Sequence, residues 1–208
     1  MDCSAERGVI SGPVGDLEIW LECPNVTPKA VMIIAHPHPL YGGIMQNKVV
    51  HTLARGALNS GVAALRFNFR GVGKSGGEYD EGRGERQDLL AVAKWVQEQF
   101  PGLPVWLSGF SFGAGVVLRT MEQAGAEKLL LVAPPLNLYP ALNKIKQIDI
   151  PWSVLMGDAD EVIPFEQVSE WVEKQQIPPD FRVFPGVSHF FHGRLVELRG
   201  AVEELMAK

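Results

Sequence analysis

The sequence predicts an α/β fold with a mostly parallel central sheet, and two patterns in its 208 residues carry this prediction. Compact apolar runs, as expected of strands buried on both faces, alternate with longer amphipathic runs that fit helices. Such strand–helix alternation is typical of a parallel sheet. The expected buried strands are KAVMIIAH (29–36), VAALRFNF (62–69), PVWLSGF (104–110), KLLLVAP (128–134), WSVLMG (152–157) and FRVFPG (181–186).

The remaining elements follow from the same periodicities. DLEIWLEC (16–23) alternates in the way of a half-buried antiparallel strand. Ligand sites of parallel sheets lie at the carboxyl ends of strands, so the loops that follow the strands are where chemistry is expected. The expected helices span 47–59, 84–99, 112–124, 164–175 and 192–206.

Length and composition limit the classes of function. A chain of this length fits one domain, 1–208. The net charge of −5 and the lack of a Lys/Arg cluster disfavour nucleic acid as a partner. The apolar runs are too short to span a membrane, and the first ten residues lack a signal-peptide pattern. Cys3 and Cys23 do not make a disulfide framework in so long a chain, so a cytoplasmic location is expected.

The tripeptide GKS at 73–75 invites a nucleotide-binding interpretation. A phosphate-binding P-loop needs G-x-x-x-x-G-K-[ST], and the first glycine of that motif would fall at Asn68. Asn68 also lies within an expected strand. The motif therefore fails at its first requirement.

A G-x-S-x-G motif follows one expected strand and opens the next expected helix. This context is that of a nucleophile elbow, in which Ser111 would be the nucleophile. Gly109, Gly113 and Gly115 would allow the two backbones to pass closely. The N–H of Phe112 would point at the oxyanion. The alternative is a glycine-rich strand–helix turn with a capping serine.

A serine hydroxyl needs a base, and the base needs an orienting acid, in the chain order Ser, acid, His. His189, just past the last expected strand, is preferred to His192, which is expected to be a solvated residue or a cap. Asp158, Asp160 and Glu161 all follow the preceding strand. Asp160 is chosen, with Asp158 as a plausible turn former and the reserve.

The loop after the first buried strand should supply a second oxyanion donor. Pro37 and Pro39 have no N–H, which leaves His38 and Leu40 open as donors. The HPH tripeptide could also ligate zinc, but a third ligand would have to come from HFFH near the C-terminus. Because His189 already has a better role there, no metal site is predicted.

The motifs AHPHPLYGG, NFRGVGKSGG, GFSFGAG, GDADEVIP and SHFFHGRL together resemble the α/β-hydrolase superfamily, and most of all its small, lidless bacterial members. The resemblance runs from about residue 15 to the C-terminus. It implies an α/β-hydrolase fold with helices on both faces of the sheet and no lid domain. It also implies a triad of Ser111, Asp160 and His189, and makes Lys74 and Ser75 part of a structural turn.

The sequence therefore predicts a serine hydrolase that cleaves small carboxylic esters or thioesters through an acyl-enzyme, with no metal or organic cofactor. A peptidase or amidase with the same triad, and a non-catalytic binding protein, are the alternatives. The expected partner is a small-molecule ester, without nucleic acid or membrane, and the protein is expected to be a monomer or homodimer. Without a lid the pocket should be shallow and open. Its candidate apolar walls are Leu40, Tyr41, Phe112, Leu136 and Tyr139.

Overall fold

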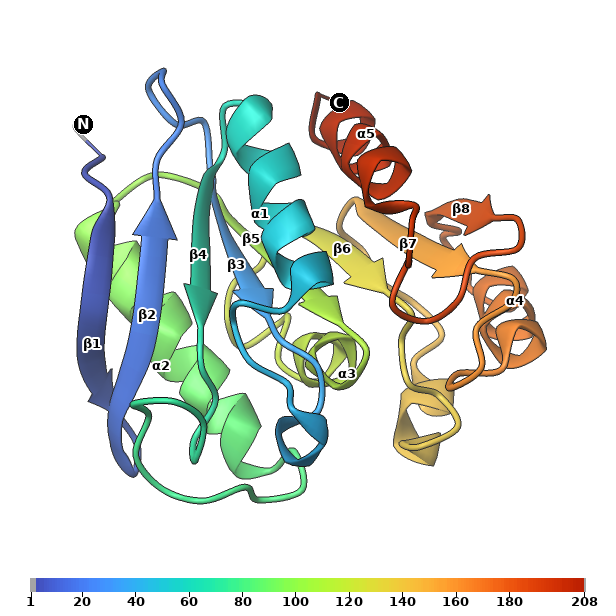
Figure 1. The fold of residues 1–208 in the computed structure, drawn as a ribbon, viewed down its shortest axis with the longest axis horizontal. Coiled ribbons are helices and arrows are strands. Elements are labelled where there is room, and N and C mark those ends of the chain that lie inside the picture. Colours follow the sequence, from blue (N-terminus) through green and yellow to red (C-terminus); the bar gives the residue numbers. More distant parts are fainter. Residues whose placement is uncertain (1–2, 208) are drawn as a thin grey trace.

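The computed structural model describes residues 3–207, which form an eight-stranded sheet flanked by helices (Figure 1). The strand order is β1-β2-β4-β3-β5-β6-β7-β8, and the strands from β3 to β8 run parallel to one another. The predicted α/β fold with a mostly parallel sheet is confirmed. The strands are β1 (Glu6–Gly12), β2 (Gly15–Glu22), β3 (Val31–Ala35), β4 (Ala63–Phe67), β5 (Val105–Phe110), β6 (Lys128–Val132), β7 (Trp152–Gly157) and β8 (Asp180–Phe184).

Helices cover both faces of the sheet. Helices α1 and α5 pack against each other on one face, and α2 and α3 lie together on the other (Figure 1). The helices are α1 (Lys48–Asn59), α2 (Gly84–Gln99), α3 (Phe112–Leu118), α4 (Phe165–Glu173) and α5 (Leu195–Ala207), with short 3₁₀ turns η1 (Pro39–Tyr41) and η2 (Pro140–Lys144). None of the helices within residues 3–207 is long and apolar enough to cross a membrane.

The central strands are mostly apolar because helices cover the sheet on both sides. Every residue of β3, β4 and β7 is buried. Arg66 is the one charged residue among them, and it pairs with Glu22 while its guanidinium lies 4.1 Å from the Trp20 ring centroid. The parallel strands thus bring their carboxyl ends to one edge of a rigid core.

Two features at the N-terminal side of the sheet differ from the sequence-based expectations. Strand β1 was not expected, since only Ile10 of its seven residues is buried and no apolar alternation marks it. It pairs antiparallel with β2, which confirms the antiparallel character expected of that segment. A disulfide joins Cys3 to Cys23, with 5.8 Å between their Cα atoms, although two cysteines in so long a chain predicted none.

The connections that follow the strands are short. The segment between β6 and β7 contains only the turn η2, so no lid domain is inserted there. Helix α3 ends at Leu118 instead of continuing to 124 as expected. The N–H groups of Arg119 and Thr120 bond to carbonyls three residues back, which tightens the chain into turns.

Candidate active site

Ser111 stands at a sharp turn between β5 and α3. Its backbone has φ 53° and ψ −119°, a conformation that non-glycine residues rarely adopt. A Cβ atom at Gly109 would lie 2.4 Å from the carbonyl carbon of Gly113, and one at Gly113 would lie 2.3 Å from the oxygen of Ala35. The small residues of the motif are therefore what lets the strand and the helix cross, as the sequence predicts.

The hydroxyl of Ser111 is not used to stabilise this turn. The backbone N–H of Ser111 donates to the carbonyl of Val132 at 2.9 Å, which ties the turn to the end of β6. Its Oγ makes no hydrogen bond with any of residues 3–207, and the residue is 6% exposed. The capping alternative has no support, since no side-chain cap bond is formed at the start of α3.

His189 and Asp160 form a buried pair in the loops after β8 and β7. The distance from His189 Nδ1 to Asp160 Oδ2 is 2.7 Å, and the two side chains are 3% and 1% exposed. The other oxygen of Asp160 accepts from the N–H groups of Val162 and Ile163, at 2.9 and 2.7 Å. Because an ionised carboxylate only accepts, the proton of a neutral His189 lies on Nδ1, and Nε2 keeps its lone pair.

The competing candidates have other contacts. Asp158 Oδ1 accepts from the N–H of Gly186 at 2.6 Å, so this carboxylate links the loop after β7 to the loop after β8. Glu161 Oε2 accepts from the backbone N–H of His189 at 3.0 Å and helps to place the loop of the base. His192 is exposed, and its ring contacts Phe190 at 6.0 Å between centroids. Of these residues, Asp160 alone bonds to the imidazole of His189.

Phe110 connects this pair to the serine. Its ring lies against the imidazole of His189, with 4.8 Å between centroids and 35° between planes. Phe110 immediately precedes Ser111, so the imidazole of His189 contacts the neighbour of the serine in the chain. Within residues 3–207 no hydrogen bond joins Ser111 to His189, and the full triad stays a prediction.

His36 anchors the start of the loop that follows β3. This residue is fully buried, its Nε2 accepts from the N–H of Phe69 at 3.1 Å, and its Nδ1 lies 2.6 Å from the carbonyl of Pro37. Burial lowers the pKa of His36 to about 4. The ring is therefore neutral at pH 7, with its proton on Nδ1, and it anchors the start of the loop without adding charge.

His38 and Leu40, the two candidate oxyanion donors, differ in their hydrogen bonding. The N–H of Leu40 donates to His38 Nδ1 at 3.2 Å, which closes the turn η1. The Nε2 atom of His38 lies 3.0 Å from the hydroxyl of Tyr79. Among residues 3–207, the backbone N–H groups of His38 and Phe112 have no acceptor. Of these two candidates, only the N–H of His38 is therefore available to bind an oxyanion.

Both histidines of the HPH tripeptide, His36 and His38, use their ring nitrogens for contacts within the protein. Each imidazole has both ring nitrogens within hydrogen-bond distance of protein atoms. Burial lowers the pKa of His38, so this ring is neutral at pH 7. No group of three or more His, Cys, Asp or Glu side chains in the part of the chain that the structure describes could hold a metal ion.

Aromatic rings surround the position next to the serine. The buried ring of Phe112 contacts His38, Tyr79 and Tyr139, with centroid distances of 5.0, 6.0 and 6.0 Å. Leu40 and Tyr41 stand at the surface, with Tyr41 86% exposed. Sequence reasoning missed Tyr79, because the segment EYD carries no periodicity or motif that would single it out.

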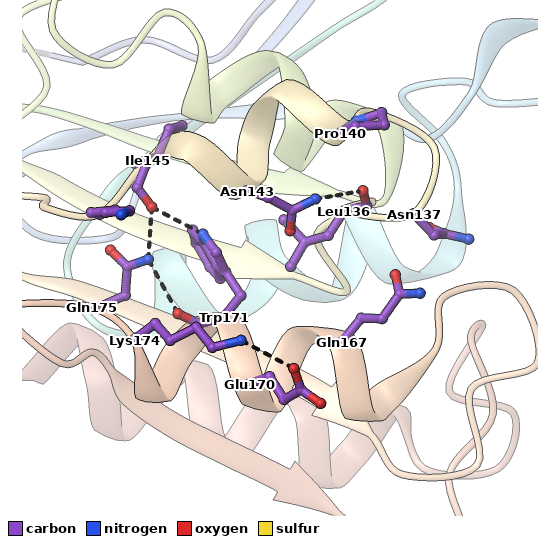
Figure 2. Close-up of a pocket in the computed structure, with 11 residues that line it drawn as sticks. Leu136, Asn137, Pro140, Asn143, Ile145, Gln167, Glu170, Trp171, Lys174 and Gln175 are labelled. Atoms are coloured by element: carbon purple, nitrogen blue, oxygen red, sulfur yellow. Dashed lines mark hydrogen bonds and ion pairs between the residues drawn. The ribbon is translucent and has the colours of Figure 1, made fainter.

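A cavity of about 460 Å³ lies between η2 and α4, and Figure 2 shows the side chains around it. Of the expected wall residues, only Leu136 lines this cavity. Asn137 donates to the carbonyl of Val162 at 3.1 Å, which connects the cavity wall to the loop of Asp160. Trp171 and Gln175 both donate to the carbonyl of Ile145, as the dashed lines in Figure 2 mark.

The GKS loop is a structural turn. Ser75 Oγ accepts from the N–H of Glu18 at 2.9 Å and donates to the carbonyl of Asn68 at 2.7 Å. The N–H of Lys74 donates to the carboxylate of Glu18 at 3.0 Å. The serine hydroxyl and the backbone N–H of Lys74, which a P-loop would offer to its magnesium ion and phosphate, are thus bonded to strand β2 and the end of β4.

Comparison with known proteins gives a consistent set of relatives. The family described as serine aminopeptidase, S33, matches residues 26–147. An α/β serine hydrolase homologue from Coxiella burnetii is 45% identical, covers 98% of both chains and superposes with a TM-score of 0.93. XC6422 from Xanthomonas campestris, described as a serine hydrolase without a lid, is 38% identical over 99% of this chain and 94% of its own, with a TM-score of 0.92. The uncharacterized protein RP471 of Rickettsia prowazekii is 31% identical over 94% of this chain and 86% of its own.

Proposed function

Because the chain belongs to the α/β-hydrolase superfamily, and to its small members without a lid, we propose that it cleaves small carboxylic esters or thioesters through a serine nucleophile. The observation that carries the proposal is the buried His189–Asp160 bond, whose imidazole contacts Phe110, the residue before a serine held at φ 53° with an unused hydroxyl. A base oriented by an acid and a serine presented on a strained turn are the parts that acyl transfer needs.

In the proposed reaction Ser111 attacks the carbonyl carbon of the ester. Nε2 of His189 takes the proton of the hydroxyl, and later delivers it to the leaving oxygen or sulfur. Asp160 holds the Nδ1–H tautomer and stabilises the imidazolium that forms. Water, deprotonated by the same histidine, then attacks the acyl-enzyme and releases the acid.

The oxyanion of the tetrahedral intermediate would be bound by two backbone donors. We assign them to the N–H groups of Phe112 and His38, because neither has an acceptor within residues 3–207. Leu40 is the weaker candidate, since its N–H already donates to His38 Nδ1. Donors fixed in advance in a site with little water contribute most to such catalysis.

An aminopeptidase or amidase is the second candidate, because the matching family is described as serine aminopeptidase. An aminopeptidase must also bind the free ammonium group of its substrate, and a carboxylate would serve that purpose. The two carboxylates beside His189, Asp160 and Glu161, already accept hydrogen bonds from the protein. This favours the ester over the peptide, and turnover of an ester against its matching amide decides between them.

A fluorophosphonate probe gives the direct test of the proposal. The probe should label the wild-type protein at Ser111 and should not label Ser111→Ala, and Ser75→Ala should be labelled like the wild type. Failure of the wild-type protein to react would favour the non-catalytic binding protein. A panel of esters of increasing acyl length then defines the substrate.

The short connection between β6 and β7 limits the length of the acyl group that we propose. Each buried methylene contributes about 0.8 kcal/mol, but only as far as the pocket extends. Because no lid extends it, kcat/KM should peak at short acyl chains, roughly C2 to C6, and fall beyond them. Efficient hydrolysis of much longer esters would contradict this part of the proposal.

We also propose a cytoplasmic location and a monomer or homodimer. The Cys3–Cys23 disulfide is the observation that opposes this location, because such bonds rarely persist in a reducing compartment. Alkylation of thiols in intact cells followed by mass spectrometry tests it. Both cysteines should be alkylated before reduction, and a pair protected until reduction would place the protein in an oxidising compartment.

A further inference from the structure

A second cavity, of about 570 Å³, lies between the start of α2, the end of α3 and η2. It shares Ile145 and Lys146 with the cavity of Figure 2, but more charged side chains line it. Four cations and one carboxylate line it, which gives a formal charge of 4 − 1 = +3 in a chain whose net charge is −5. These charged residues are Arg86, Arg119, Lys144, Lys146 and Glu122.

The four cations of this basic cavity are not neutralised by the protein. Within residues 3–207 none of them forms an ion pair, whereas Lys174 in the neighbouring cavity pairs with Glu170 at 3.1 Å. The negative charge of Glu85 partly offsets the lowering of the pKa of Arg119 by burial, but Glu85 forms no ion pair with it. The two carboxylate oxygens of Glu85 accept from the N–H groups of Asp80 and Gly82. Positive charge therefore accumulates in this hollow, where Glu122 is the one carboxylate among the lining residues.

Two guanidinium nitrogens of the basic cavity are buried and lack an acceptor. They are Nε of Arg86 and Nη2 of Arg119. A buried donor without an acceptor lowers the stability of the protein, and such groups in native proteins usually have an ion or water as partner. Burial lowers the pKa of Arg119, and the charge of Arg86 lowers it further. The two like charges are thus held close together at the cost of stability.

Arg119 is held in place before any ligand arrives. Its Nε donates to the carbonyl of Gly115 at 3.0 Å, and its guanidinium lies 5.0 Å from the centroid of the Tyr139 ring. Gly82 makes room for it, since a Cβ atom there would lie 2.4 Å from Nη2. A fixed guanidinium loses little conformational entropy when it binds an anion.

We propose that the basic cavity binds a small molecule that carries a phosphate group. A phosphate monoester brings a charge of nearly −2 and three acceptor oxygens, which suits two guanidinium groups with two ammonium groups nearby. A carboxylate would neutralise only one of the three net charges. The volume exceeds that of one phosphate group, so the organic part of the molecule would also fit inside.

The proposed ligand lies apart from the serine. Tyr139, under Arg119, contacts the ring of Phe112, and Phe112 follows Ser111 in the chain. No residue of the proposed triad lines the basic cavity. Binding of phosphate can therefore be measured on Ser111→Ala protein, and the result does not depend on whether the protein is a hydrolase.

The test is calorimetric titration of Ser111→Ala protein with glycerol 3-phosphate, inorganic phosphate and acetate, at constant ionic strength in chloride. We expect glycerol 3-phosphate to bind best, inorganic phosphate more weakly, and acetate least. Arg86→Gln should weaken phosphate binding at least about tenfold, the loss expected for one charged hydrogen bond. Lys144→Gln with Lys146→Gln, two exposed changes that leave the core intact, should weaken it by several-fold.

Lys94→Gln is the matched control for Arg86→Gln, because Lys94 lies on the same helix, is 78% exposed and stands outside the cavity. This control should bind phosphate like the parent protein. Equal weakening by Lys94→Gln and Arg86→Gln would show a general charge effect and overturn the site. Equal affinity for acetate and phosphate would overturn the choice of phosphate. No heat of phosphate binding above the heat of dilution would overturn the site.

Discussion

Two glycine-rich loops follow parallel strands of this sheet, and each contains a serine, but the hydroxyl groups of the two serines differ in their hydrogen bonding. In the loop after β4, Ser75 Oγ accepts one hydrogen bond and donates another, both to backbone atoms. In the turn after β5, Ser111 Oγ bonds to none of residues 3–207, although its backbone is held at φ 53°. One hydroxyl stabilises its loop, whereas the other is left free by a backbone conformation that costs stability.

The difference shows that similar local sequences acquire different roles from their surroundings. GKSGG and GFSFG both look like sites for an anion or a reactive group. The side chains of Glu18 and Asn68 close the first loop, and Gly73 could not carry a Cβ without meeting both of them at 2.4 Å. The second loop is closed by backbone contacts alone, which leaves its side chain for chemistry.

The largest expected effect separates the two serines directly. Ser111→Ala should lower kcat by roughly 10⁴ to 10⁶, because the nucleophile is lost while alanine keeps the same turn. Ser75→Ala should retain the kcat of the folded wild-type protein. Steady-state kinetics on a short acyl ester measures both. A Ser111→Ala protein that kept a tenth of the activity would show that Ser111 is not the nucleophile, and the two loops would then not differ in role.

The acid provides the next largest effect. Asp160→Asn should lower kcat by about 10⁴, because an amide that donates to Nδ1 favours the wrong tautomer of His189. Asp158→Asn is its control, since Asp158 bonds only to the N–H of Gly186 and should lose far less activity. The reverse order of the two losses would show that the other aspartate serves the base.

A stability change with pH follows from His36, which anchors the loop opposite Ser111. Its pKa is about 4 in the folded protein and 6.5 in the unfolded chain, so only the unfolded chain takes up a proton between these values. The free energy of unfolding should therefore fall as the pH falls from 6.5 to 4, by up to about 3 kcal/mol. Urea unfolding at several pH values measures this slope.

His36→Gln should flatten the slope, whereas His192→Gln, at an exposed position, should keep it. The comparison uses the change with pH within each variant, so a general loss of stability in His36→Gln does not affect it. A wild-type slope no steeper than that of His36→Gln would contradict the assignment.

The smallest expected effect is on the structural loop. Ser75→Ala should lower the free energy of unfolding by about 1–3 kcal/mol, because the N–H of Glu18 and the carbonyl of Asn68 lose their partner in a buried place. Thermal or urea unfolding measures it. Ser111→Ala, which removes no hydrogen bond, should leave the stability within about 0.5 kcal/mol of the wild type.

The sequence predicts the elements that burial controls and misses those that depend on distant partners. Five of the six compact apolar strands, β3 to β7, are recognised because both of their faces are covered, whereas β8, expected to be buried on both faces, lies at the edge of the sheet and buries only Phe184. Strand β1 is missed because it buries only Ile10, and its pairing with β2 supplies the rest of its stability. The Cys3–Cys23 bond is missed for the same reason, since it depends on that hairpin.

The residues of the candidate site also fall into those that the sequence predicts and those that it misses. Ser111, Asp160 and His189 can be chosen because each follows a strand and their chain order is that of a known catalytic arrangement. The bond of Tyr79 to His38 spans 41 positions and leaves no pattern in the sequence. The basic cavity is likewise assembled from α2, α3 and the η2 segment, whose lysines and arginines look like ordinary surface charges when read in order.

The backbone of Ser111 has a consequence for how this position can evolve. A residue with a Cβ at φ 53° and ψ −119° costs about 1–3 kcal/mol, and glycine would not bear this cost. Ser111→Gly should thus have a higher free energy of unfolding than the wild type, but it could not form an acyl-enzyme. Selection for stability alone would replace the serine, so under the proposed mechanism selection for activity opposes selection for stability at this single residue.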